Sequence, residues 1–155
     1  MKKETFDSAL RSTWHQVSKM YNKEASKFDS TMAMGFALLS IDAEGTPSTT
    51  LGPKMGMEPT SLSRLLNTLE TRKLIYRSQN PADGRSILIH LTAFGKEKRE
   101  DSKAVVLHFN AEIEKQLNAK KIQHFFEVMQ CIKEQALEFE HFNTSTKQMY
   151  YENNR

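Results

Sequence analysis

Residues 59–72 constrain the fold most, because they combine a leucine stripe with a polar face over one helical length. The leucines recur at three- and four-residue steps, which places them on one side of an α-helix; they are Leu62, Leu65, Leu66 and Leu69. The opposite side carries hydrogen-bonding and charged side chains: Thr60, Arg64, Asn67 and Thr71. The segment therefore predicts a helix that is anchored in a core and presents polar groups outward.

Two short runs rich in β-branched residues follow, at 74–77 and 86–91. The segment between them contains the turn formers of residues 80–84, so the pattern predicts a two-stranded β-hairpin. Alternation within the second run divides its residues between two faces. We expect a packed face with Ile87, Ile89 and Leu91, and His90 on a solvated face.

Helical periodicity dominates the rest of the chain. We expect helices at about 4–28, 32–41 and 49–55, then a long helix capped by Thr92, a break at Asn118 and a last helix to about 139. The start of the long helix has almost no apolar residues, whereas a stripe resumes at Val105, so its start should be exposed and its end packed. Residues 143–155 are predicted to be a flexible tail.

Composition excludes several classes of protein. A chain of 155 residues fits one domain, and a mean hydropathy of −0.61 without a long apolar run excludes a membrane-spanning protein. The first residues lack an apolar run that would act as a secretory signal, and the single cysteine gives no disulfide framework, so we expect a cytoplasmic protein. We expect Cys131 to be a buried structural thiol rather than a redox sensor.

The positive charge is concentrated near the predicted helix and hairpin. The whole chain carries a net charge of +3, and the window 54–91, with six basic and three acidic residues, accounts for the same excess. Such a segment is suited to an acidic partner such as nucleic acid. A chance fluctuation would give the same excess, so charge alone leaves both interpretations open.

The order of elements is typical of a winged helix-turn-helix, mainly α with a small β-hairpin wing. In this plan one helix fits the DNA major groove, where polar side chains bond to base edges, and the hairpin tip reaches the minor groove or phosphates. The polar face of 59–72 and the basic turn near Arg85 stand where that plan requires them.

Over residues 4–142 the chain resembles the MarR family of transcription regulators, most specifically in SLSRLLNTLETRKLIYR and DGRSILIHLTAFG. The second stretch reproduces the wing pattern of that family with Asp83, Arg85, Leu91, Thr92 and Gly95. The resemblance implies that 59–72 reads the major groove, that the wing arginine enters the minor groove, and that the first and last helices form a homodimer. Such proteins usually repress genes and often release DNA when a small aromatic ligand or an oxidant acts on them.

The resemblance also implies a domain organisation. We expect a single domain over 1–155, with a DNA-binding core at 31–92 and dimerisation helices at 4–28 and 93–142. Three departures from the family pattern stand in the core. Gly52 and Pro53 replace helix formers, so the 49–55 helix should be kinked or start late; Lys73 stands where Gly is common; and Gly84 replaces a frequent second Arg.

Candidate DNA contacts follow from these placements. The helix offers Thr60, Ser61, Ser63, Arg64 and Asn67, and the hairpin tip offers Arg85, oriented by Asp83 through a charge-assisted bond. Lys54 and Arg77 are expected to position phosphates rather than to read bases. Capping remains an alternative role for the Ser and Thr residues, and solvated surface charge remains one for the cations.

Adaptable apolar side chains near the first helices suggest a pocket for a small aromatic or apolar effector. They are Trp14, Met20, Tyr21, Met32, Met34 and Phe36, for which core packing is the alternative. The five histidines lack paired metal spacing and no catalytic motif is present, so we expect neither metal, cofactor nor enzymatic activity.

The predicted function is control of transcription, more simply by repression, with a homodimer on a near-palindromic stretch of double-stranded DNA. Two alternatives remain: a winged-helix scaffold for protein interactions that does not bind DNA, and a small-molecule carrier or enzyme that uses the apolar space beside Trp14.

Overall fold

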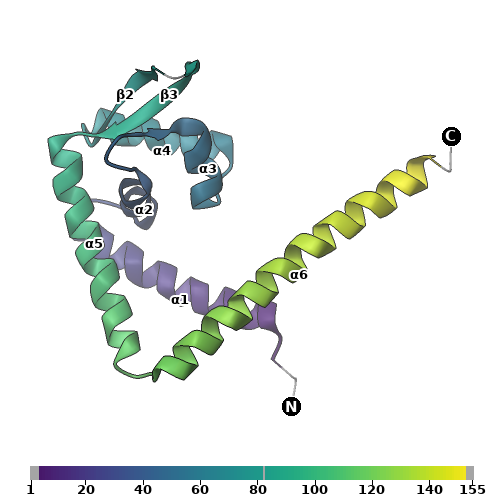
Figure 1. Cartoon of the computed structure of the whole chain (residues 1–155). Helices are drawn as coiled ribbons and strands as arrows, with labels where there is room; N and C mark the ends of the chain where they lie inside the picture. The colour runs from purple at the N-terminus through teal and green to yellow at the C-terminus, as the bar shows by residue number, and fades with distance from the viewer. Residues whose placement is uncertain (1–3, 82, 153–155) are drawn as a thin grey trace. The chain divides into compact units, whose positions relative to one another are not determined.

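The computed structural model describes residues 4–81 and 83–152, which divide into two units at His108 and Phe109. The fold is mainly helical with a β wing, as the sequence predicts (Figure 1). In chain order the elements are α1 (Phe6–Ser26), α2 (Met32–Ser40), β1 (Thr46–Pro47), α3 (Ser48–Met55), α4 (Pro59–Thr71), β2 (Ile75–Asn80), β3 (Asp83–Leu91), α5 (Ala93–Glu114) and α6 (Ala119–Glu152).

The predicted β-hairpin is confirmed as β2 and β3, and β1 adds a third strand to give an antiparallel sheet in the order β1-β3-β2. β1 pairs with β3 through Thr46 opposite Ile89. Two residues are too short to show an alternating pattern, and Pro47 reads as a strand breaker, although proline is acceptable on an edge strand. β2 and β3 also extend to Asn80 and Asp83, so most of the expected 80–84 turn belongs to strands.

The leucine stripe of α4 is buried, as predicted. Leu62, Leu66 and Leu69 are buried and Leu65 is partly buried. They join one core with residues from α2, α3 and the sheet: Met34, Ala37, Leu38, Ile41, Leu51, Leu74, Ile75, Ile89 and Leu91. This burial fixes the rotation of α4 about its axis, so its polar face turns to solvent.

The faces of β3 differ in part from the prediction. Ile89 and Leu91 are buried, but Ile87 is 40% exposed because it lies nearer the hairpin tip, beyond the helices that cover the sheet. His90 is not freely solvated. The His90 ring stacks on the Tyr76 ring with 4.9 Å between the ring centroids, and its Nε2 lies 2.9 Å from Ser78 Oγ. The turn at Gly45 also packs directly against the His90 ring.

Lys73 ends α4 in the left-handed conformation, with φ of 58°. Its N–H donates to Glu70 O at 2.8 Å, and the N–H of Leu74 donates to Leu69 O at 2.9 Å. These two bonds are those of a helix C-terminal motif that usually contains Gly. A non-glycine residue therefore stands where the backbone requires positive φ, as the sequence comparison suggested.

The predicted late start of the 49–55 helix is wrong, since α3 begins at Ser48. Pro53 lies near the end of α3, where its missing N–H affects only one helical bond. Gly56 then ends the helix with φ of 62°. Gly52 is buried, and a Cβ there would lie 3.2 Å from Met57 O, so glycine allows the chain to fold back tightly after the helix.

Thr92 and Gly95 join α5 to the end of α4. Thr92 Oγ1 donates to Lys73 O at 2.6 Å and accepts from the N–H of Gly95 at 2.9 Å, which confirms the predicted cap. A Cβ on Gly95 would stand 1.9 Å from Leu74 O. Only glycine lets the first turn of α5 approach the chain this closely.

The exposure of α5 agrees with the prediction only in part. Lys98 and Ser102, near its start, are partly buried, whereas Leu107 is 58% exposed and Ile113 41% exposed. The polar start packs because its long side chains cover aromatic rings: Lys98 Nζ lies 5.6 Å from the centre of the Phe94 ring. Of the predicted apolar stripe, Val105 and Phe109 are partly buried, whereas Ile113 and Leu117 are exposed.

In the second unit, α6 begins after Asn118, whose Oδ1 accepts from the N–H of Lys121 at 2.9 Å. α6 continues through residues 143–152, so the segment that we expected to be a tail has a helical backbone. Cys131 is exposed, which corrects the expected buried thiol. No helix among the described residues is long and apolar enough to cross a membrane.

Candidate nucleic-acid interface

The outward face of α4 presents hydrogen-bonding groups and one cation. Every residue predicted to contact DNA from this helix is exposed: Thr60, Ser61, Ser63, Arg64 and Asn67. No described residue bonds to the Arg64 guanidinium. The side-chain hydroxyl of Thr68 donates to the backbone carbonyl of Arg64 at 3.0 Å, which leaves the Arg64 side chain unengaged. Arg64 is therefore free to bind an external acceptor.

Arg77 connects the wing to this face. Its Nη1 donates to Glu70 Oε2 at 2.6 Å and its Nη2 donates to Asn67 Oδ1 at 2.8 Å, so one guanidinium on β2 holds two side chains of α4. The sequence did not indicate this bridge, because the partners are separated by a turn. Its contact with phosphate stays a prediction, and in this structure its guanidinium bonds to α4.

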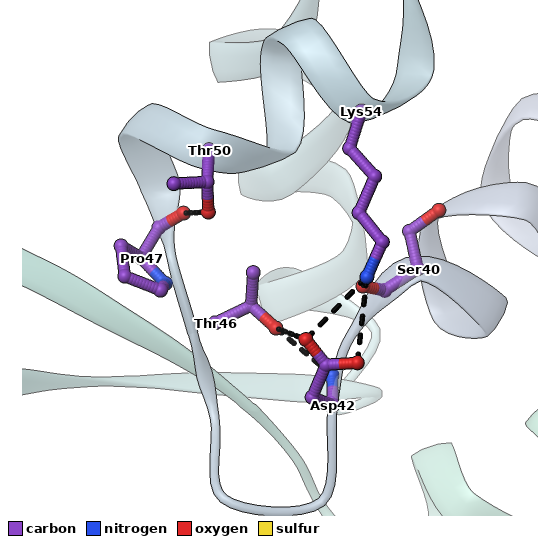
Figure 2. Close-up of polar contacts among 6 residues, drawn as sticks. All are labelled: Ser40, Asp42, Thr46, Pro47, Thr50 and Lys54. Atoms are coloured by element: carbon purple, nitrogen blue, oxygen red, sulfur yellow. Dashed lines mark hydrogen bonds and ion pairs between the residues drawn. The ribbon is translucent and has the colours of Figure 1, made fainter.

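Lys54 closes a polar cluster at the start of the helix-turn-helix (Figure 2). Its Nζ donates to Ser40 O at 2.8 Å and lies 3.4 Å from both carboxylate oxygens of Asp42. Thr46 Oγ1 donates to Asp42 Oδ2 at 3.1 Å and accepts from the Asp42 N–H at 2.9 Å. The hydrogen bond from Thr46, and after it the contact with Lys54, lowers the pKa of Asp42.

This cluster ties three elements together, since Ser40 ends α2, Thr46 begins β1 and Lys54 lies on α3. Lys54 is thus engaged within the fold, and its predicted role in positioning phosphate remains a prediction. A second cation that the sequence analysis did not single out acts similarly. Arg72, which follows α4, donates from Nη2 to Asp29 Oδ2 at 3.0 Å and places Nη1 3.8 Å from the Met34 sulfur.

The wing tip is described in part. Asp83, Gly84 and Arg85 lie on β3, but the Arg85 side chain falls outside the described side chains, and with it the predicted bond to Asp83. A Cβ added at Gly84 would have only Gln79 Nε2 near it, at 3.7 Å. The structure thus gives no steric reason for glycine where the family often has arginine.

A cavity of about 80 Å³ opens between α1, α2 and the first part of α5. Of the six residues predicted to form an effector pocket, Tyr21, Met32 and Phe36 line it. The other three do not. Met34 is buried in the core, Trp14 is 53% exposed, and Met20 is partly buried outside the lining. Periodicity places these residues on helices, but only packing shows which of them meet.

The cavity also contains charged groups that the prediction did not include. Arg72, Lys98 and Asp101 line it together with Phe28 and Phe94. Lys98 Nζ donates to Asp101 Oδ2 at 2.8 Å, and this hydrogen bond raises the pKa of Lys98. The lining therefore combines aromatic rings with charged side chains of both signs.

Comparison with known proteins agrees with this geometry. A family model described as the MarR family matches residues 31–87, from the start of α2 into β3. An uncharacterised HTH-type transcriptional regulator, YhbI of Bacillus subtilis, is 26% identical over 120 residues, which are 77% of each chain. HTH-type transcriptional regulator SarZ of Staphylococcus saprophyticus is 29% identical over 116 residues, 71% of this chain and 80% of that one. These matches confirm the resemblance to the MarR family over the residues that the family model covers.

Solved structures support the MarR fold. MepR of S. aureus in complex with DNA superposes with a TM-score of 0.76 at 21% identity, over 84% of this chain and 97% of that one. Apo MarR of E. coli gives 0.68 at 22% identity, over 84% and 98%. CouR of Rhodococcus jostii bound to p-coumaroyl-CoA gives 0.73 at 23% identity, over 83% and 92%. At these identities the likeness shows the fold alone.

The family-model match and the HTH-type regulators to which the chain is similar identify it as a winged helix-turn-helix transcriptional regulator rather than an enzyme. The matched region contains α4 and the cations Lys54, Arg64, Arg72 and Arg77. Thr92 and Gly95 lie just beyond it, yet their contacts with Lys73 and Leu74 seat α5 on the same core. The family pattern at the end of the wing therefore corresponds to a joint between the DNA-binding core and the long helices.

Proposed function

We propose that two copies of this chain bind a near-palindromic DNA operator and repress transcription by covering it. One observation carries the proposal: α4 turns an exposed polar face outward opposite its largely buried leucine stripe, and no described residue engages the Arg64 guanidinium. Such a face fits the major groove, where Arg bonds to guanine and shorter polar side chains bond to bases or phosphates.

The wing would contact the flanking minor groove or phosphates through Arg85, with Asp83 orienting that arginine. Thr60, Ser61 and Ser63 lie in the first half of α4, the part of a recognition helix that enters the groove most deeply. Lys54 and Arg77 would add attraction to phosphates while they hold α3 and α4 in place.

Apolar residues exposed on the long helices support a second copy of the chain as partner. Phe6 and Trp14 on α1 and Phe125, Phe126 and Phe139 on α6 are each more than half exposed. Large exposed aromatic residues in such number mark interaction surfaces. A two-fold dimer would place two recognition helices about one DNA turn apart, which requires an operator with matching symmetry.

Selection of bound sequences from a random duplex pool tests the proposal, and a pair of half-sites one turn apart is the expected result. Arg64→Ala should weaken binding by about 1–3 kcal/mol and relax the preference at one base position. Arg64→Lys is the control, because it keeps the charge but loses the two-pronged contact with guanine. An equal loss on every sequence would assign Arg64 to phosphate. Absence of binding to any duplex at low salt would favour a protein-interaction scaffold.

We further propose that a small aromatic effector occupies the cavity between α1, α2 and α5. Support comes from its aromatic walls, Tyr21 and Phe36, whose rings meet edge to face at 5.5 Å, and from the cations Arg72 and Lys98 in its lining. A CouR structure shows that a protein of this fold can bind p-coumaroyl-CoA. Arg72 belongs to the loop after α4, so occupation of the cavity would act on the recognition helix.

A further inference from the structure

Asn67 is held in one orientation by its contact with Arg77. The guanidinium has only N–H donors, so the amide group must turn its oxygen toward Arg77 and its nitrogen away. The observed contact, Arg77 Nη2 to Asn67 Oδ1 at 2.8 Å, has this polarity. The exposed end of Asn67 is therefore its NH₂ group, which can donate hydrogen bonds but cannot accept them.

Arg77 is itself fixed from two sides. Its main chain pairs with Ile89, a fully buried residue of β3, and its Nη1 donates to Glu70 Oε2 at 2.6 Å. Asn67 and Glu70 are three residues apart and so lie on the same side of α4. Both bonds to the guanidinium are charge-assisted, and the Arg77 side chain is 34% exposed. One cation thus immobilises both side chains and neutralises the carboxylate beside the DNA-facing surface.

We infer that Asn67 recognises a base edge that presents only acceptors. An unrestrained asparagine bonds to adenine with both amide atoms, accepting from N6 and donating to N7. Because Arg77 takes one lone pair of Oδ1 and holds the amide with its oxygen toward the wing, that two-pronged contact is disfavoured. The remaining donors suit O6 and N7 of guanine or O4 of thymine. The inference rests on the proposed insertion of α4 into the major groove, and Arg77 acts in it as a positioning residue.

Selection from a random duplex pool identifies the base that Asn67 recognises, because Asn67→Ala should lose preference at one position of each half-site. The wild type should enrich guanine or thymine at that position. Arg77→Met combined with Glu70→Gln removes the guanidinium without leaving an unpaired carboxylate, and it frees Oδ1. Adenine should then gain about 5- to 150-fold over guanine there, the range expected for a two-pronged contact. Adding Asn67→Ala to this double variant should abolish that gain.

Asn67→Asp gives a second test that leaves Arg77 and the fold in place. The aspartate keeps an acceptor toward Arg77 and replaces the outward donor with an acceptor, so the preferred base should change to cytosine, whose N4 donates. Enrichment of adenine by the wild type, or an unchanged preference in both Asn67→Asp and the Arg77 variant, would overturn the inference. Failure of the wild type to bind any duplex would instead refute the proposed function.

Discussion

Replacement of Lys73 by glycine should stabilise the protein. Lys73 holds φ of 58° at the end of α4, and the two backbone bonds made by its own N–H and by that of Leu74 keep it there. No described residue bonds to its ammonium group. Its carbonyl accepts from Thr92 Oγ1 at 2.6 Å, a bond that any residue at this position can make. The substitution therefore removes a strained Cβ and no described side-chain contact.

The size of the effect is a difference between two terms. A residue with a Cβ loses about 1–2 kcal/mol in the left-handed conformation. Glycine gives the unfolded chain more freedom, which offsets about 0.4–1 kcal/mol. The net gain in the free energy of unfolding should be about 0.5–1 kcal/mol. For a chain of this size that gain raises Tm by about 1–4 °C.

Thermal unfolding followed by circular dichroism measures this gain, at equal protein concentration because the proposed dimerisation would make Tm depend on concentration. Lys73→Ala is the matched control, since it removes the same charge but keeps the Cβ, and its stability should stay within about 0.5 kcal/mol of the wild type. A glycine variant no more stable than the alanine variant would refute the assignment of strain to Lys73.

Two further predictions concern the joints of the fold. Gly95→Ala should destabilise the protein by about 3 kcal/mol or more in urea unfolding, because the new Cβ would overlap Leu74 O; Gly84→Ala, with open space around it, should change stability by less than about 0.5 kcal/mol, and equal effects would contradict the packing described. Asp42 has a pKa below its ordinary value of 3.8, chiefly because Thr46 bonds to it, so its ionised form adds stability above about pH 4 that is lost as the pH falls through the folded pKa. The Tm difference between wild type and Asp42→Asn should accordingly stay constant from about pH 7 to 5 and shrink below about pH 4, whereas a difference that persists at low pH would point to shape rather than charge.

The sequence predicts local structure well where a periodic pattern has a single solution. The leucines of α4 recur at helical spacing and are buried, and Thr92 precedes α5 and caps it. Lys73 also has the positive φ suggested by its place in the sequence, because positive φ is a property of one backbone position. Each of these features is decided by residues within about one helical turn.

Contacts between distant residues were not predictable in the same way. Arg77 meets Asn67 only once β2 has folded against α4, and Lys54 meets Asp42 only once α3 lies across the end of α2. The error in α5 has a related cause. Hydropathy predicts that its apolar end is buried but not by what, and Ile113 and Leu117 are exposed while Lys98 and Ser102 near the polar start are partly buried.

The same contacts change what the central positive charge means. Three of the six basic residues in 54–91 are engaged by acidic groups of the same unit: Lys54 by Asp42, Arg72 by Asp29 and Arg77 by Glu70. These cations hold helices in place, so a count of charges overstates the attraction to phosphate. Because each phosphate contact steepens the salt dependence of binding by a fixed increment, few free cations imply a shallow dependence. Recognition would then rest mainly on hydrogen bonds from α4, and sequence specificity would depend on residues such as Arg77 that fix the side chains of that helix.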